Sequence, residues 1–493
     1  MSHKKPKNIL FVLPTHFASR NILMSDIPTI LSNGERGKAT FVSLYPEDGE
    51  RIRAFGSESL SWHHQKRPEK LQALLGLAPL VNFLRNICYK IAHLLFLKRA
   101  SHAALVYRFN NINNFFGHRL RRSMAHWFRI KLPWQPKTKS HFSAQRYADP
   151  KLGWPLASST KVYGFLHSLY FWNWGNNPRV EAFFENNHFD LVVINYIQTA
   201  RIFHYLNAAK RRDIPVIGMV GSWDNPTLKG PVAPGLCRYL VQNRYMAEQL
   251  INHHRILEKD IAITGWPQMD IYCKEDVIIP RRDLLTRLGL AAESKVILFG
   301  ANTKRLGRHE PSIMQHIIQQ IQAGRYGDQV ALVIRPHPGD RLWKERYAKF
   351  MNQERVVVQE PSYTDRADFA NLVKHSDIVI SSAGTISLDA AAFDTCAINI
   401  AFDGNLEVSE KESVAMYYKL EHYASIVETG GTLLVHSFAG LDRAIIRYLA
   451  DPALDQKHRQ ALRDYHLAPL DGQSAARMAA MLLDFECIQS KVS

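Results

Sequence analysis

Cysteine is scarce in this sequence, and its distribution is irregular. The 493 residues contain five cysteines, and no two of them form a CxxC pair. They are Cys88, Cys237, Cys273, Cys396 and Cys487. An odd number of scattered cysteines predicts neither a disulfide framework nor a zinc site. We expect buried or surface thiols in a reducing cytoplasm.

Long apolar runs are also missing. No stretch of about 18 uninterrupted apolar residues occurs, so the sequence predicts no membrane-spanning helix. The N-terminal segment MSHKKPKNILFVLP contains only the short apolar run ILFVL. This run is shorter than the apolar region of a secretory signal peptide and better fits a first strand.

Acidic residues are almost absent from one long segment. Between Ser61 and Ser140 there are fifteen lysines and arginines and a single acid, Glu69, whereas the formal net charge of the whole chain is +17. Apolar residues at helical spacing from Leu74 to Leu95, followed by aromatic residues among arginines, indicate an interfacial helix on an anionic membrane. The alternatives are a helical subdomain whose charges are solvated and a nucleic-acid surface. No recognised nucleic-acid module accompanies the charge, so we expect no nucleic-acid partner.

Short apolar runs alternate with helix-length segments along the rest of the chain. The strands predicted in the first half are 8–14, 38–45, 189–196, 215–223, 238–243 and 260–265. Those predicted in the second half are 295–302, 330–337, 355–361, 376–382 and 396–402. This alternation predicts an α/β protein with two Rossmann-like, doubly wound parallel-sheet domains. The expected boundaries are 1–265 with a basic insertion at about 50–180, 266–455, and closing helices at 456–493.

Two such domains in tandem place a cleft between the carboxyl ends of both sheets, where ligands bind in these folds. The segment SDIVISSAGTISLDAAAF predicts a strand, a loop of small residues and a helix. Small residues let a ligand approach the backbone, and the free N–H groups of a helix start bind phosphate. An ordinary helix capped by Thr385 is the alternative. The candidate phosphate ligands in this loop are Ser381, Ser382, Gly384 and Thr385.

Two further strand exits of the second half carry polar residues. In VIRPHPGD, the two prolines stiffen the exit and hold His337, which is placed to stabilise a phosphate leaving group, with Arg335 beside it. In LFGANTKRLGRHEP, Asn302 and Thr303 offer N–H and hydroxyl groups. Gly265, in ITGWPQMD, lies where the chain crosses between the domains.

The order of these motifs resembles a known family. TG-x-P-x-x-D, a small polar loop, RPHP and SD-x-x-ISS-x-GT-x-x-x-D are together similar to the nucleotide-binding half of GT-B glycosyltransferases. The resemblance is strongest to the branch with CDP-glycerol glycerophosphotransferases and sugar-nucleotide 2-epimerases, and it covers roughly 190–450. It implies a nucleotide-activated donor held by the second domain, with Asp389 on a donor hydroxyl. It also implies no cofactor and no metal, and the sequence has no DxD motif.

The loop VGSWDNPTLKG departs from that family in one position. The comparable exit in the glycerophosphotransferases reads roughly TWHGTPLK, and its histidine is the proposed base. Here Asp224 replaces the histidine, which favours sugar transfer over polyol-phosphate transfer. Asp224 could instead organise an Asx-turn. The remaining cleft residues expected from this loop are Trp223, Asn225, Thr227 and Lys229.

His16, at the exit of the first strand, is the rival base, and Arg20 is placed to help hold an anionic acceptor. We expect a cytoplasmic glycosyltransferase, peripheral at the inner face of the membrane, that adds a sugar to a hydroxyl of a lipid-linked surface glycan. Three alternatives stay open: a polyol-phosphate transferase, a sugar-nucleotide 2-epimerase and a non-catalytic nucleotide-sugar-binding protein.

Overall fold

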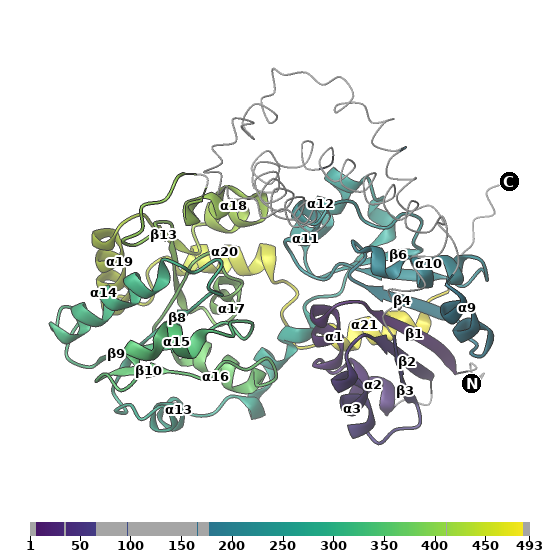
Figure 1. Ribbon diagram of the computed structural model, residues 1–493, viewed down its shortest axis with the longest axis horizontal. Helices are drawn as coiled ribbons and strands as arrows, with labels where there is room; N and C mark the ends of the chain where they lie inside the picture. Colours follow the sequence, from purple (N-terminus) through teal and green to yellow (C-terminus); the bar gives the residue numbers. More distant parts are fainter. Residues whose placement is uncertain are drawn as a thin grey trace, which may run out of the picture.

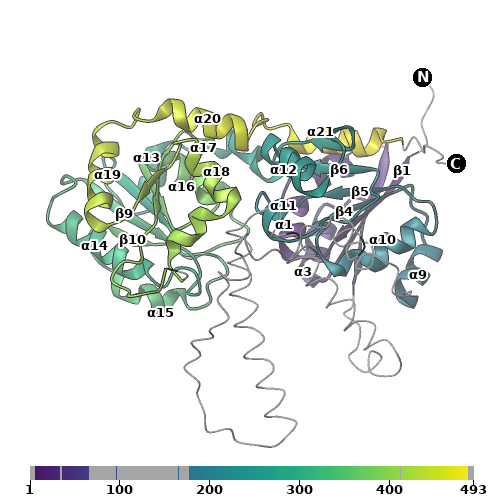
Figure 2. The same cartoon turned by 90° about the horizontal axis from the view of Figure 1, so that it is seen from above.

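The computed structural model describes residues 6–33, 36–65, 177–410 and 412–486, together with residues 96 and 165. Two α/β domains lie side by side, each built on a fully parallel sheet (Figures 1 and 2). The predicted fold class is therefore confirmed. Most of the basic insertion at about 50–180, including nearly all of Ser61–Ser140, lies outside the described residues.

The first domain contains a seven-stranded sheet in the order β3-β2-β1-β4-β5-β6-β7. Its strands are β1 Lys7–Leu13, β2 Gly37–Ser43, β3 Leu60–His64, β4 Leu191–Asn195, β5 Val216–Met219, β6 Arg238–Val241 and β7 Ile261–Ile263. β1 pairs in parallel with β2 on one side and with β4 on the other. The direction of winding reverses at β1, so its carboxyl end is the switch point at which such sheets bind ligands.

The second domain repeats this arrangement with six strands in the order β10-β9-β8-β11-β12-β13. They are β8 Lys295–Gly300, β9 Val330–Arg335, β10 Val356–Val358, β11 Ile378–Ser381, β12 Cys396–Ile400 and β13 Leu433–Val435. Here β8 lies at the switch point, paired with β9 and β11. The loops that follow β8, β9 and β11 are the polar loops that were predicted from the sequence.

Helices cover both faces of each sheet (Figure 1). The first domain has α1 His16–Leu23, α2 Ile27–Ser32, α3 Pro46–Ala54, α9 Pro178–Glu185, α10 Phe203–Lys210, α11 Asn225–Leu228 and α12 Arg244–His254. The second has α13 Arg281–Arg287, α14 Glu310–Gln322, α15 Trp343–Tyr347, α16 Arg366–His375, α17 Ile386–Ala392, α18 Glu421–Glu428 and α19 Phe438–Ala450. Among the described residues, no helix is both long and apolar enough to cross a membrane.

The central strands are buried on both faces, which explains their uninterrupted apolar sequences. Residues 9–13 of β1 and 191–195 of β4 are fully buried. Parallel sheets covered by helices on both sides require this pattern. Two edge strands were not predicted. β3 reads LSWHH, with alternating burial and two histidines, and two of the three residues of β13 are only partly buried.

The last two helices join the domains. α20 Gln456–His466 lies against the second domain, whereas α21 Ser474–Asp484 returns to the first (Figure 2). Met478 and Leu482 of α21 are buried in the core of the first domain. Asp270, at the crossing between the domains, accepts hydrogen bonds from the backbone N–H groups of Ser474 and Ala475 at 3.1 and 2.7 Å. A carboxylate at a helix N-terminus stabilises the start of the helix. Asp270 therefore holds the start of α21 against the first domain.

Gly265 is required by this packing. Its φ is +86°, and a Cβ placed there would lie 2.3 Å from Ser474 Oγ and 3.0 Å from the Pro469 carbonyl oxygen. We predict that Gly265→Ala lowers the free energy of unfolding by more than the about 1–2 kcal/mol that a left-handed conformation costs alone. Gly56→Ala is the matched control, since Gly56 has a φ of +60° and no heavy atom within 4 Å of such a Cβ. Equal losses of stability in urea titrations of the two variants would contradict the packing account.

Candidate active site

A cleft lies between the two domains at the carboxyl ends of both sheets. It holds about 1190 Å³ of empty space, including open solvent. The first domain lines it with Phe17, Arg20, Gly221, Ser222 and Trp223. The second domain lines it from the exits of β8, β9 and β11 and from α16 and α17. Such a position, with a few convergent polar groups, is typical of ligand sites in this class of fold.

His337 lines the cleft at the exit of β9, as the sequence predicted. Its Nδ1 accepts the backbone N–H of Gly339 at 2.9 Å. Burial lowers the pKa of His337, and the Arg20 charge lowers it further while Asp340 acts in the opposite direction. The ring is therefore neutral near pH 7, and the bond at Nδ1 leaves the proton on Nε2. His337 thus presents a hydrogen-bond donor without carrying a full charge.

The loop from Ser382 to Thr385 supplies backbone donors to the same cleft. Ala383 has a φ of +51°, a strained value for a residue with a Cβ, and its N–H donates to Tyr418 Oη at 2.8 Å. Gly384 and Thr385 both line the cleft, and neither backbone N–H has a hydrogen-bond acceptor among the residues that the structure describes. Thr385 precedes α17 without the side-chain cap that the sequence allowed. Open backbone N–H groups of this kind bind phosphate oxygens.

A buried carboxylate holds this loop in place. Glu310, at the start of α14, is fully buried and accepts both the backbone and the side-chain N–H groups of Asn302. The Asn302 amide also donates to the Ser382 carbonyl oxygen at 2.5 Å. Arg346 lies 3.5 Å from Glu310 and donates to the Asn302 carbonyl oxygen. Asn302 lines the cleft, but its polar groups are used to join the exits of β8 and β11.

Arg335 and Asp389 line the cleft with partners of their own. The Arg335 guanidinium pairs with Asp368 at 3.2 Å. Asp389 accepts the hydroxyl of Tyr272 at 2.7 Å. Burial raises the pKa of Asp389, although that hydroxyl and two nearby arginines act in the opposite direction. Asp389 can still accept a bond from a ligand hydroxyl, as predicted, because a carboxyl group has more than one acceptor site.

The loop Ser222–Lys229 is mainly an interface between the domains. Trp223 lines the cleft, but it is 2% exposed, with its ring edge-on to His422 and Tyr423 of α18. Asp224 is outside the lining and pairs with Lys229 at 3.5 Å. Burial alone would raise the pKa of Asp224, but Lys229 and His422 bring it below its usual value. Asn225 and Thr227 are buried beneath this turn.

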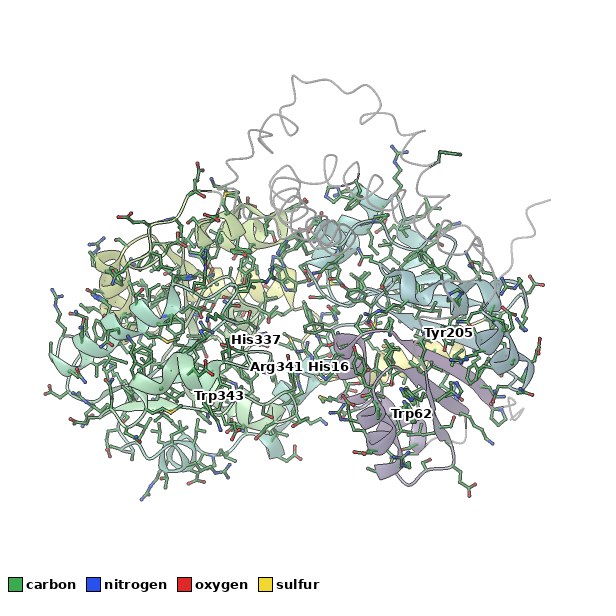
Figure 3. All side chains as sticks on the ribbon, in the orientation of Figure 1. His16, Trp62, Tyr205, His337, Arg341 and Trp343 are labelled. Carbon is green, nitrogen blue, oxygen red and sulfur yellow. The ribbon has the colours of Figure 1, made fainter. Side chains whose placement is uncertain are left out.

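His16 occupies the first position of α1, directly after β1. Its ring centroid lies 5.1 Å from that of Tyr363, a cleft residue of the second domain. Figure 3 shows His16 and His337 on facing edges of the two domains. Neither of the two bases considered from the sequence lines the cleft itself: His16 precedes the lining residue Phe17, and Asp224 follows the lining residue Trp223.

Four predicted donor ligands lie outside the lining. Gly265 packs against α21, and the Thr303 carbonyl closes the turn that follows β8. The Ser381 hydroxyl donates to Asn399, and the Ser382 hydroxyl is bonded to His309 at 2.9 Å. The hydroxyls of Ser381 and Ser382 therefore support the loop after β11 and do not line the cleft.

Sequence reasoning missed three groups that shape the cleft. Glu310 lies inside the quoted segment LFGANTKRLGRHEP and Tyr272 lies two residues after ITGWPQMD, and both contact predicted ligands, but neither was singled out. Arg366, the first residue of α16, lines the cleft directly. A polar residue at the start of a helix that follows a parallel strand is a usable signal for such a position, but it is too common to single out one residue.

The sequence profile of the CDP-Glycerol:Poly(glycerophosphate) glycerophosphotransferase family matches residues 236–484, half of the chain. The chain belongs to this family. It is a family of transferases, and the match includes the whole second domain together with β6, β7 and α21. The loop Ser222–Lys229 and His16 lie outside the matched residues. No curated protein sequence matches the chain.

Several solved structures have a similar fold. The S. aureus MnaA–UDP complex has a TM-score of 0.52 and 11% identity, with 97% of this chain and 96% of that chain covered. UDP-GlcNAc 2-epimerase from Neisseria meningitidis bound to UDP-GlcNAc has a TM-score of 0.52 and 13% identity, with 97% of this chain and 100% of that chain covered. A glycosyltransferase from Rickettsia africae has a TM-score of 0.51 and 10% identity, with 98% of this chain and 100% of that chain covered. At these identities the likeness establishes the fold, which is of the GT-B type.

Within the described residues, no group of three or more His, Cys, Asp or Glu side chains is arranged to hold a metal ion. Independence from metals and cofactors stays a prediction.

Glu310 should make stability depend on pH. Burial raises the pKa of its carboxyl to about 7, against the opposing hydrogen bonds from Asn302 and the charge of Arg346. Between about pH 4.5 and pH 7 the native state therefore holds this proton more tightly than the unfolded state, and the unfolding free energy falls as pH rises. Glu310→Gln should remove up to about 3 kcal/mol of this dependence.

Urea unfolding at about pH 5 and about pH 7.5 measures the effect, and the exposed Glu407→Gln variant is the control. Equal pH dependence in the wild-type protein and the Glu310→Gln variant would show that the carboxyl does not titrate in this range.

Proposed function

We propose that this protein transfers a sugar from a nucleoside-diphosphate donor to a hydroxyl of a surface glycan, without a metal ion. The observation that carries the proposal is the set of donors at one end of the cleft. His337 presents Nε2–H there, and Gly384 and Thr385 have open backbone N–H groups. Hydrogen-bond donors that are already in position before the reaction stabilise the charge that develops on a departing diphosphate. The neighbours solved with UDP or UDP-GlcNAc support a nucleotide-activated donor.

His16 is the base that we propose for the acceptor hydroxyl. A general base must lie within reach of the acceptor hydroxyl, and His16 contacts the cleft residue Tyr363 from the edge of the first domain that faces His337. Asp224 has a lowered pKa and an ion pair with Lys229, which makes it a weaker base in this structure. Its role in the proposal is to hold the loop that carries Trp223 against α18.

A second candidate is transfer of a polyol phosphate. The family match favours it, because the family is described by a glycerophosphotransferase activity. In that reaction the acceptor hydroxyl attacks phosphorus, and the transferred group keeps a phosphate. The resemblance described from the sequence implies a histidine where this chain has Asp224, and this difference is our reason for preferring sugar transfer.

The experiment is a transfer and donor-hydrolysis assay with a panel of UDP- and CDP-linked sugars and with CDP-glycerol in parallel. A nucleotide sugar should be cleaved and CDP-glycerol should not. His337→Ala should lower turnover by about 100-fold or more, because a donor to the leaving phosphate is lost. His436→Ala, an exposed histidine at another strand exit, should not change it. Cleavage of CDP-glycerol alone would establish the second candidate, and binding without any cleavage would indicate a non-catalytic protein.

The same assay distinguishes the two bases. His16→Asn should lower kcat by about 100-fold or more while nucleotide binding stays intact. Asp224→Asn should retain turnover within a few-fold and lower the melting temperature, because the pair with Lys229 is broken. If the Asp224→Asn variant is folded but inactive and the His16→Asn variant is active, Asp224 is the base and His16 is not.

Attachment to the cytoplasmic face of a membrane, next to a lipid-linked acceptor, belongs to the same proposal. It rests on the composition of Ser61–Ser140, with fifteen basic residues and one acid. We predict that the protein floats with vesicles containing anionic lipid and that deletion of this segment abolishes flotation, since each basic residue near the headgroups contributes about 1 kcal/mol. Flotation that is unchanged by the deletion would exclude the segment as the anchor.

A further inference from the structure

The loop Ser222–Lys229 places Trp223 in the wall of the cleft, but it has little regular structure of its own. Its helix, α11, has only four residues. A single helical turn is not stable by itself, because it fixes several residues in return for one or two hydrogen bonds. The position of Trp223 therefore depends on the contacts that other elements make with this loop.

Two side chains from other elements hold α11 through the carbonyl oxygens of its first residues. Gln198 Nε2 donates to the Asn225 carbonyl oxygen at 2.7 Å, and Gln198 is itself buried. His254, the last residue of α12, bonds the Pro226 carbonyl oxygen through Nε2, also at 2.7 Å. Because a carbonyl oxygen only accepts hydrogen bonds, the proton in this bond is on Nε2. Figure 1 shows α11 and α12 next to each other.

The His254 ring packs against a residue of the basic segment Ser61–Ser140. The ring centroid of Phe96 lies 4.6 Å from that of His254, and the two planes are tilted by 30°. Phe96 is 1% exposed, so its ring lies in the protein interior. Aromatic rings at this distance attract each other, and the packing restricts rotation of the imidazole. Phe96 therefore keeps His254 Nε2 directed at the Pro226 carbonyl oxygen.

The basic segment and the cleft are connected by these contacts. Phe96 contacts His254, His254 bonds Pro226, and Pro226 lies three residues after Trp223 in the same short loop. Packed side chains and hydrogen bonds of this kind carry energetic coupling between separate parts of a protein. The family match begins at residue 236, so it includes His254 but neither Phe96 nor the loop.

We infer that Phe96 is a positioning residue, which holds His254 on the Pro226 carbonyl oxygen and so fixes the loop that places Trp223 at the cleft. Whatever binds the basic segment then also acts on the cleft. For the anionic membrane proposed above, docking of the segment raises turnover through this contact. That last step rests on the proposed function, whereas the positioning of the loop by Phe96 does not.

Hydrogen–deuterium exchange of the full-length protein measures the state of the loop without any substrate. The backbone N–H groups of Leu228 and Lys229 close the turn of α11, at 3.0 and 3.1 Å from their acceptors. In Phe96→Ala these two amides should exchange about tenfold faster, since a hydrogen bond that holds the turn is weakened. The amides of β1, in the core of the same domain, should exchange as in the wild-type protein.

Phe165→Ala is the matched control, since Phe165 belongs to the same insertion at about 50–180 but is 67% exposed. Its exchange in α11 should equal that of the wild-type protein. His254→Ala should reproduce the effect of Phe96→Ala. The double variant should show no more than the larger single effect, because both changes act on one hydrogen bond. If Phe96→Ala does not fold, Phe96→Leu replaces it, and loss of the ring should still speed exchange in α11.

The response to lipid is measured with the transfer assay, with and without vesicles that contain anionic lipid. Wild-type turnover should rise several-fold with these vesicles and not with neutral ones. Phe96→Ala should float with anionic vesicles as the wild-type protein does, because basic residues provide the attraction to the headgroups. Its turnover should nevertheless not respond to them.

Unchanged exchange of the Leu228 and Lys229 amides in Phe96→Ala would overturn the inference. Additive effects of Phe96→Ala and His254→Ala would do the same, since they would show that Phe96 does not act through His254. Stimulation by vesicles that persists in Phe96→Ala, or its absence in the wild-type protein, would contradict the coupling to the membrane. If no nucleotide sugar is cleaved, the proposed function fails, whereas the exchange measurement still decides the role of Phe96.

Discussion

The donor side of the cleft depends on one buried carboxylate. Glu310 accepts both N–H groups of Asn302, and Asn302 in turn donates to the carbonyl of Ser382. These contacts join the exits of β8 and β11, which would otherwise be independent loops. Arg346 completes the arrangement by pairing with Asp340 in the loop that follows His337. The exits of all three central strands are thereby fixed relative to one another, so the backbone N–H groups of Gly384 and Thr385 keep their direction without a ligand.

The charges of the molecule are organised differently in its supporting loops and in its cleft. Outside the cleft, the buried arginines Arg346 and Arg459 have carboxylate partners, Asp340 and Asp394. At the cleft, Arg20 and Arg366 face each other with no ion pair among the described residues. Unpaired buried charge is destabilising, and it persists in proteins mainly where a ligand of opposite sign binds. This contrast separates residues that hold the site from residues that contact ligands.

Much of the fold could be predicted from the sequence because the central strands are uninterrupted apolar runs. The runs beginning at Asn8 and Lys295 correspond to β1 and β8, which are covered on both faces. The edge strands β3 and β13 were not predicted, since a short or half-exposed strand has no long uninterrupted apolar run. The same reasoning located His337 and the small loop at Gly384, because polar residues that directly follow a core strand lie at the ligand edge of a parallel sheet.

The positions of Asp224 and Gly265 could not be predicted from the pattern of apolar runs. Asp224 follows the buried strand β5 and Gly265 follows the edge strand β7, yet Asp224 pairs with Lys229 at the domain interface, and Gly265 packs against a helix more than 200 residues later in the chain. Which strand exits face the cleft is decided by the packing of one domain on the other and by the return of α21. Neither depends on local sequence. Arg366 was missed for the same reason, because its partner in space, Arg20, belongs to the other domain.

The central claim is that a nucleoside diphosphate binds at the second-domain side of the cleft. A crystal structure with UDP or CDP bound tests it most directly. The account predicts phosphate oxygens within hydrogen-bond distance of His337 Nε2 and of the backbone N–H groups of Gly384 and Thr385. A nucleotide bound elsewhere, or one whose phosphates contact neither His337 nor this loop, would contradict the account.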